Sequence, residues 1–166
     1  MNTKKLTGMA LLIAMGTMAG ISSIPVGGAL IYPAQHAINV VAAVLFGPGP
    51  AVIIAFCVAL LRNMMQTGTL LAFPGGMIGA LVAALAFKAT GKKYAAALGE
   101  VFGTGVLGAL VAFPLARFVL GRDVLAFTYI VPFAMSSLAG AVVGLSVVRV
   151  TAAEVFKSKK QTERCR

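Results

Sequence analysis

The segment LTGMALLIAMGTMAGISSIPVGGALIYPAQHAINVVAAVLFGPGPAVIIAFCVALL, residues Leu6–Leu61, contains no Asp, Glu, Lys or Arg. A helix crosses a bilayer with ~20 apolar residues, so this segment is long enough for more than one crossing. Further charge-free runs follow at 63–87, 101–116 and 124–148. Over the whole chain the mean hydropathy is +0.98 and only 11% of residues are charged, against ~25% in soluble domains. The sequence therefore predicts a polytopic membrane protein.

Clusters of proline, glycine and threonine divide the apolar sequence into helices, because such residues punctuate helical segments. Backbone in lipid must satisfy its own hydrogen bonds, so each segment is expected to be α-helical. The expected helices cover residues 6–22, 34–47, 51–66, 70–88, 93–120 and 125–150. We predict an all-α bundle of six transmembrane helices over residues 1–150, followed by a basic cytoplasmic tail over residues 151–166.

The basic residues set the expected orientation. Of fourteen Lys and Arg residues, eleven lie at the N-terminus, between the fourth and fifth helices, or at the C-terminus, and three (Arg62, Arg117 and Arg122) lie toward the other side. The positive-inside rule then places both termini in the cytoplasm of a multi-pass cell-membrane protein. Topology explains the net charge of +10, so no nucleic-acid partner is expected. The tail either contacts anionic lipid or is a solvated end.

The N-terminal segment and the two cysteines each allow an interpretation that we disfavour. The start, MNTKKLTGMALLIAMGTMAG, has the shape of a cleavable signal peptide. Its removal would leave five helices and break the charge symmetry, so we expect it to be retained. Cys57 and Cys165 lie far apart in this topology, and the chain has no CxxC spacing, so neither a disulfide nor a metal site is expected.

Several motifs are absent from the sequence. There is no G-x-x-x-x-G-K-[ST] phosphate loop, so the chain alone is not expected to hydrolyse ATP. It has no G-x-S-x-G or H-E-x-x-H and a single histidine, which disfavours an enzyme. A coupled transporter usually carries several ionisable groups within the membrane, and here only Glu100 lies well inside a helix. The sequence predicts a small bundle that binds something, with no cofactor and no motor of its own.

Small residues recur four apart on several expected helices, a spacing that lets helices approach closely in lipid. The pairs are Ala10 and Ala14, Gly16 and Gly20, Gly75 and Gly79, Gly99 and Gly103, and Gly140 and Gly144. Most are expected to serve packing inside the bundle. The first helix is the best candidate to receive a partner, because it is strongly apolar and has no polar residue in its interior.

Polar residues of separate loops are expected to meet at the outer membrane face. The candidate ligand-binding residues there are His36, Asn39, Asn63, Thr69 and Tyr129. Apolar surroundings with a few convergent polar groups are typical of a ligand pocket, and the Gly- and Pro-rich loop over residues 21–35 can close it as a lid. Alternatives stay open: His36 as a helix cap, Arg62 as a snorkelling residue and Tyr129 as an interfacial aromatic residue.

Glu100 is the most informative residue of the sequence. It lies about seven residues into the fifth expected helix, ~10 Å from its cytoplasmic end, where a carboxylate is costly and points to function. Thr104 lies one turn further on the same face. We name both as candidate ligand-binding residues, with a purely structural network as the alternative.

Three strings resemble the ThiW family: SIPVGGALIYPAQHAINV (23–40), LLRNMMQTGTLLAFPGGMIGAL (60–81) and ALGEVFGTGVLGAL (97–110). The resemblance extends from about residue 3 to residue 150. It implies a substrate-binding S component of an energy-coupling factor (ECF) transporter, with the six-helix S-component fold and a loop that closes over the ligand. It also implies the thiamine precursor hydroxyethylthiazole as substrate.

The same resemblance implies partners. They are a transmembrane T component and two cytoplasmic ATPase subunits, with Ala10 and Ala14 meeting the T component. Thiamine or another small vitamin precursor is the alternative substrate. From other classes, a small proton-coupled carrier or channel using Glu100 and an assembly subunit without a ligand remain as alternatives.

Overall fold

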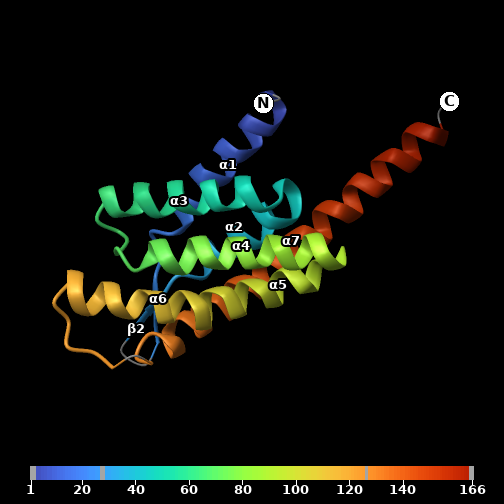
Figure 1. Cartoon of the computed structure of the whole chain (residues 1–166). Helices are drawn as coiled ribbons and strands as arrows, with labels where there is room; N and C mark the ends of the chain where they lie inside the picture. The colour runs from blue at the N-terminus through green and yellow to red at the C-terminus, as the bar shows by residue number, and fades with distance from the viewer. Residues whose placement is uncertain (1–2, 27–28, 126, 165–166) are drawn as a thin grey trace.

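The computed structural model describes residues 3–26, 29–125 and 127–164, and it is predominantly helical (Figure 1). In chain order the elements are α1 (Thr3–Ala19), β1 (Ile24–Val26), β2 (Ala29–Ile31), α2 (Pro33–Phe46), α3 (Pro48–Met64), α4 (Ala72–Thr90), α5 (Lys93–Phe102), the π-helical η1 (Gly103–Gly108), α6 (Ala109–Pro114), the π-helical η2 (Leu115–Val119) and α7 (Ile130–Arg164). The elements α5 to η2 form one continuous helix, Lys93–Val119.

Three helices of the described residues are long and apolar enough to cross a membrane: Ala72–Thr90, Lys93–Val119 and Ile130–Thr151. Helices α2 and α3 are shorter and also apolar. Many large apolar side chains face outward, such as those of Met18 and Phe118, as expected of a surface that contacts lipid. A multi-pass membrane protein is therefore confirmed. The count of six crossings, the cytoplasmic placement of the termini and the S-component fold stay predictions.

Helix α2 lies at the centre of the bundle, although it is short enough to extend only ~21 Å. It packs against α1, α3, α4, α5 and α7, and its residues 35–43 are all buried. This position explains how Gln35, His36 and Asn39 can occur on an otherwise apolar helix. Neighbouring helices rather than acyl chains surround these side chains, so the polar groups can find partners within the protein.

Most predicted helix boundaries lie within three residues of the observed ones, but the last helix ends at Arg164 rather than at residue 150, so its backbone continues through the predicted tail. Two of the starting positions differ for local reasons. Helix α3 begins at Pro48 rather than at residue 51, because proline is well suited to the first helical position. The last helix begins at Ile130 rather than at residue 125. The Leu125 and Thr128 backbone forms a turn, closed by Thr128 Oγ1 accepting from Leu125 N at 3.1 Å.

The long helix Lys93–Val119 contains two π-helical segments, whereas a regular α-helix was predicted there. Glycines of η1 bring it close to its neighbours: a Cβ on Gly105 would lie 3.0 Å from Ala134 Cα, and one on Gly108 would lie 2.7 Å from Gly75 Cα. The second π segment follows Pro114, which lacks an N–H for the α-helical ladder. Such π segments are frequent at functional sites, and η1 carries Thr104.

The segment between α1 and α2 contains a short antiparallel hairpin, β1–β2, where a loop was expected. The hairpin is attached to α7, since Tyr32 N donates to Ser136 Oγ at 2.8 Å. Gly27 and Gly28 of the predicted lid lie outside the described residues, as does Cys165. Helix α7 continues as one backbone helix to Arg164 and extends past the other helices (Figure 1).

Candidate functional site

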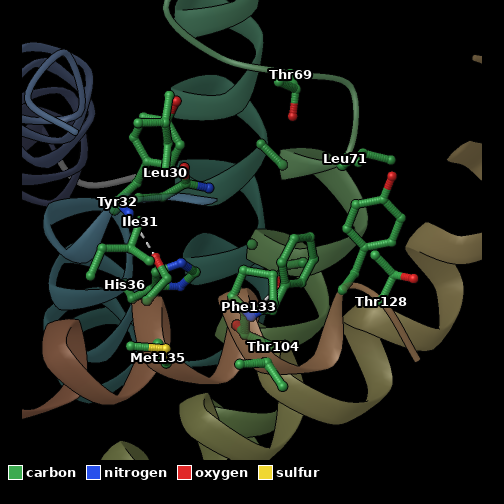
Figure 2. Close-up of a pocket in the computed structure, with 18 of the residues that line it drawn as sticks. Leu30, Ile31, Tyr32, His36, Thr69, Leu71, Thr104, Thr128, Phe133 and Met135 are labelled. Carbon is green, nitrogen blue, oxygen red and sulfur yellow. Dashed lines mark hydrogen bonds between the residues drawn. The ribbon is translucent and has the colours of Figure 1, made fainter. Parts of the chain in front are cut away.

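A cavity of about 630 Å³ opens between β2, α2, α4, η1 and α7, within the range of ~300–1,000 Å³ common for small-molecule sites. Figure 2 shows Ile31, Tyr32 and His36 on one side of it, and Leu71 and Thr128 on the other. Its polar lining residues are Tyr32, Gln35, His36, Arg62, Thr69, Thr104, Arg122, Thr128, Tyr129 and Ser136; its larger apolar ones include Leu30, Leu71, Phe133 and Met135. Apolar walls with a few polar groups suit a small, partly polar ligand.

Four buried polar residues form what we term the Glu100 cluster: Glu100, His36, Asn39 and Thr104. The Glu100 side chain is fully buried, and its Oε1 accepts from His36 Nδ1 at 2.8 Å, Asn39 Nδ2 at 3.0 Å and Thr104 Oγ1 at 3.0 Å. Because a carboxylate oxygen accepts, Nδ1 of His36 carries the proton. The other ring nitrogen, Nε2, has no hydrogen-bond partner among the described residues, and His36 lines the cavity.

Two members of the Glu100 cluster also bond to the backbone of α4. The second amide hydrogen of Asn39 goes to Gly76 O at 3.1 Å, so both Nδ2 hydrogens have acceptors. Thr104 Oγ1 lies 3.1 Å from Gly75 O. Its single hydroxyl proton can serve either Gly75 O or Glu100 Oε1 at one time. Thr104 therefore has two alternative acceptors for one proton.

A glycine of α4 makes room for the Glu100 cluster. A Cβ on Gly79 would meet Thr104 Oγ1 and lie 2.7 Å from Glu100 Oε2. This second carboxylate oxygen is buried and has no hydrogen-bond partner among the described residues. This oxygen lies instead against the backbone of α4 at Gly79.

A second set of residues, termed here the Arg62 cluster, consists of Arg62, Gln35, Thr67 and Tyr32. Arg62 is 1% exposed. Its guanidinium group donates to Gln35 Oε1 and, at 2.9 Å, to Thr67 O, and its central carbon lies 4.3 Å from the centroid of the Tyr32 ring. Nε is buried without a hydrogen-bond partner, and no carboxylate pairs with Arg62 within the described part of the chain.

A comparison with known families identifies the class of protein to which this chain belongs. The model of the family described as "Thiamine-precursor transporter protein (ThiW)" matches residues 6–154, which is most of the chain. The chain belongs to the ThiW family. Neither the curated proteins nor the solved structures contain a significant match. Membership confirms the predicted resemblance and identifies a transporter family, which is not a class of enzyme, whose substrate is a small molecule.

Within this ThiW-family chain, the predicted ligand-binding residues fall into two groups. His36, Thr69, Thr104 and Tyr129 line the cavity. Asn39 and Glu100 lie behind its wall, held by the bonds described above. Thr69 is exposed, and Tyr129 precedes α7 and packs on Phe133 with ring centroids 6.0 Å apart.

Asn63 also lies away from the cavity lining. Its amide donates to Ala59 O at 2.8 Å and to Thr69 O at 3.1 Å, so both hydrogens are already used within α3 and the turn after it. Asn63 therefore holds the turn that presents Thr69. Its contact with a ligand stays a prediction.

The small-residue pairs of α1 face in opposite directions. Ala10 and Ala14 are exposed. Gly16 and Gly20 are buried: a Cβ on Gly16 would lie 2.9 Å from Val58, and one on Gly20 would lie 2.6 Å from Arg62 Cδ. One pair therefore serves packing within the chain, and the other leaves a shallow outward strip.

Several residues that line the cavity were not among the predicted ligand-binding residues. Ser136 and Phe133 lie in an apolar run, where a serine is usually interpreted as a helix-packing residue and a phenylalanine as a lipid-facing residue. Arg62 was not included because a long basic side chain at a helix end fits snorkelling equally well. The two consecutive serines, Ser136 and Ser137, interrupt this apolar run, and they were the sequence feature that could have indicated cavity-lining residues on α7.

Proposed function

We propose that this chain is the substrate-binding S component of an ECF-type importer and that it binds hydroxyethylthiazole from outside the cell. The observation that carries the proposal is the cavity: about 630 Å³, apolar in most of its lining, with His36 and Thr104 facing it. The ligand combines a small aromatic ring with one hydroxyl, which matches such a lining. Membership of a thiamine-precursor transporter family supports the substrate class.

The Glu100 cluster suggests how the hydroxyl is recognised. With its proton on Nδ1, neutral His36 presents Nε2 as an acceptor, which suits the ligand hydroxyl. Thr104 can turn its own hydroxyl proton away from Gly75 O when a better acceptor arrives. Glu100 then acts behind both residues as a positioning residue, and Phe133 offers a ring for stacking.

Closure and energy input require other parts of the assembly. The hairpin β1–β2 lies over the cavity through Leu30 and Ile31, and its release from Ser136 would open a path for the ligand. The exposed pair Ala10 and Ala14 is the surface proposed to meet the T component, because small residues allow close helix approach. Two cytoplasmic ATPase subunits would then supply the energy that this chain, lacking a phosphate loop, does not provide.

Ligand binding to the purified chain tests the substrate. Isothermal titration in detergent is expected to give saturable binding of hydroxyethylthiazole that His36→Phe weakens at least tenfold, because the acceptor for the hydroxyl is lost. Thiamine bound tightly, with no binding of the precursor, would overturn the substrate and keep the class.

The docking surface has its own experiment. Changing Ala10 and Ala14 together to Leu is expected to prevent co-purification with the T component, because bulky side chains keep the helices apart. Leu11→Ala, on the same exposed side of α1, is the matched control and should leave the complex intact. An unchanged complex in the double variant would exclude this face.

The buried His36–Glu100 pair also favours one other function, a proton-coupled carrier. In that case the isolated chain would accumulate hydroxyethylthiazole in liposomes along a proton gradient without ATP, and Glu100→Gln would abolish uptake. An S component alone should show no gradient-driven uptake.

A further inference from the structure

Positive charge dominates the lining of the cavity. Arg62 and Arg122 both line it, Arg62 buried and Arg122 exposed. Among the described residues, no aspartate or glutamate lines the cavity, and Asp123 next to Arg122 is not part of the lining. A buried cation without a paired anion is costly, and it raises the electrostatic potential felt by any ligand in the same space.

The acid behind the cavity does not cancel this charge. Oε1 of Glu100 is surrounded by three donors, and Oε2 lies against α4 at the Gly79 position. The carboxyl group therefore has no free oxygen directed at the cavity. One acidic residue thus lies behind the cavity wall, whereas two arginines line the cavity, so the net charge around the cavity is positive.

The aromatic rings that line the cavity each have a partner within the chain. Tyr32 lies against the guanidinium group of Arg62 at 4.3 Å. Tyr129 and Phe133 pack on each other. The chain contains no tryptophan, the residue best suited to hold a quaternary nitrogen. The cavity therefore lacks the negative charge of a cation site, and one of its three rings, Tyr32, already lies against a cation.

We propose that Arg62 is the specificity-determining residue that makes this cavity reject cationic rings and accept neutral or anionic ones. This inference rests on the proposed function, in which the ligand is a thiazole compound. Hydroxyethylthiazole has a neutral ring, whereas thiamine carries a permanent positive charge on its thiazolium nitrogen. Arg62 thereby selects the precursor against the finished vitamin, by repulsion rather than by an added attraction.

The size of the effect follows from Coulomb's law. Two like charges ~7 Å apart at an effective dielectric constant of ~20 repel enough to change a dissociation constant by roughly tenfold to a hundredfold. An anionic substituent on the ring would gain by a similar factor. The phosphate ester of hydroxyethylthiazole is therefore expected to bind at least as tightly as the alcohol.

Three ligands with the same ring test the inference on the full chain in detergent. They are hydroxyethylthiazole, its N-methylated thiazolium and its phosphate ester. We expect the thiazolium to bind at least tenfold more weakly than the neutral compound. Arg62→Gln should reduce that ratio to about threefold or less, and Arg62→Lys, which keeps the charge, should preserve it.

A second variant covers the case in which Arg62→Gln does not fold. Gln35→Glu places a carboxylate of nearly the same shape beside Arg62, where Gln35 Oε1 already accepts from the guanidinium group. Pairing the charge in this way should also raise thiazolium affinity relative to the neutral ring.

The outcomes separate the two proposals. Equal binding of the neutral and methylated rings by the unmodified chain would overturn the role of Arg62 and leave the proposed function standing. A ratio unchanged in both Arg62→Gln and Gln35→Glu would do the same. If none of the three ligands binds, the proposed function fails and the inference falls with it.

Discussion

The Glu100 cluster and the Arg62 cluster each bury one charged side chain, yet they are built differently. Three side chains converge on one oxygen of Glu100. Arg62 has one side-chain oxygen, one backbone oxygen and one ring face. Buried charges need many partners to offset lost hydration. One oxygen of the acid is therefore saturated by side chains, whereas Arg62 is held by fewer side-chain partners and leaves Nε without one among the described residues.

This difference assigns separate tasks to the two clusters. The Glu100 cluster joins α2, α4 and the α5–η1 helix behind the cavity, so its first role is to fix the helices and the orientation of His36. The Arg62 cluster joins α3, α2 and the end of the hairpin segment at Tyr32, and Arg62 lines the cavity itself. Removing partners from one cluster and then the other measures how far this division holds.

The largest effect is expected from Glu100→Leu. The variant leaves His36 Nδ1 and one amide hydrogen of Asn39 buried without an acceptor, at about 1–3 kcal/mol each, so the free energy of unfolding should fall by about 3 kcal/mol. Glu100→Gln is the matched control, because it keeps an acceptor oxygen and the shape. Denaturant titration in mixed micelles measures both, and equal losses would show that the negative charge of Glu100, which both variants lack, matters more than the acceptor oxygen that only Gln keeps.

Gly79→Ala comes next. Its new methyl group would meet Thr104 Oγ1 and the Glu100 carboxyl, and overpacking of this kind costs about 1–3 kcal/mol. Gly49→Ala is the control, since no atom lies within 4 Å of its added Cβ. Melting temperatures in detergent should fall clearly for the first variant and not for the second. Unchanged melting temperatures in both variants would mean that the Glu100 cluster can repack around the added methyl group.

Gln35→Leu tests the Arg62 cluster. It removes the side-chain acceptor of a buried guanidinium group, a loss of about 1.5–3 kcal/mol for hydrogen bonds to charged groups. Gln35→Glu retains an acceptor and should be at least as stable as the unmodified chain. Thermal unfolding with and without ligand compares the two, and a stable Gln35→Leu protein would indicate that Thr67 O and Tyr32 suffice for Arg62.

The smallest effect is expected from removing the Tyr32 ring, which lies against Arg62. Tyr32→Leu removes the aromatic face and should cost ~1 kcal/mol, whereas Tyr32→Phe keeps the ring and should cost little. The same unfolding titration detects the difference. Equal destabilisation by both substitutions would place the contribution in the Tyr32 hydroxyl instead.

Hydrophobicity made the membrane assignment and most helix positions predictable. Long charge-free runs and Gly/Pro breaks are local properties of the chain, and they located α2, α4 and the Lys93–Val119 helix within a few residues. Glu100 and Thr104 were predicted to lie together, because a carboxylate inside an apolar helix is rare and because four-residue spacing places both on one face, and Thr104 Oγ1 does lie 3.0 Å from Glu100 Oε1.

Tertiary structure alone decided which polar groups meet. His36 and Glu100 are separated by 64 positions in the chain, and Arg62 and Gln35 by 27, so neither contact follows from helical periodicity. The burial of Arg62 depends on how α1, α3 and the hairpin segment pack around it, because the same side chain at a free helix end would extend to water. Composition determined that this chain lies in a membrane, and the packing of α2 among its neighbours determined where the charges within it are held.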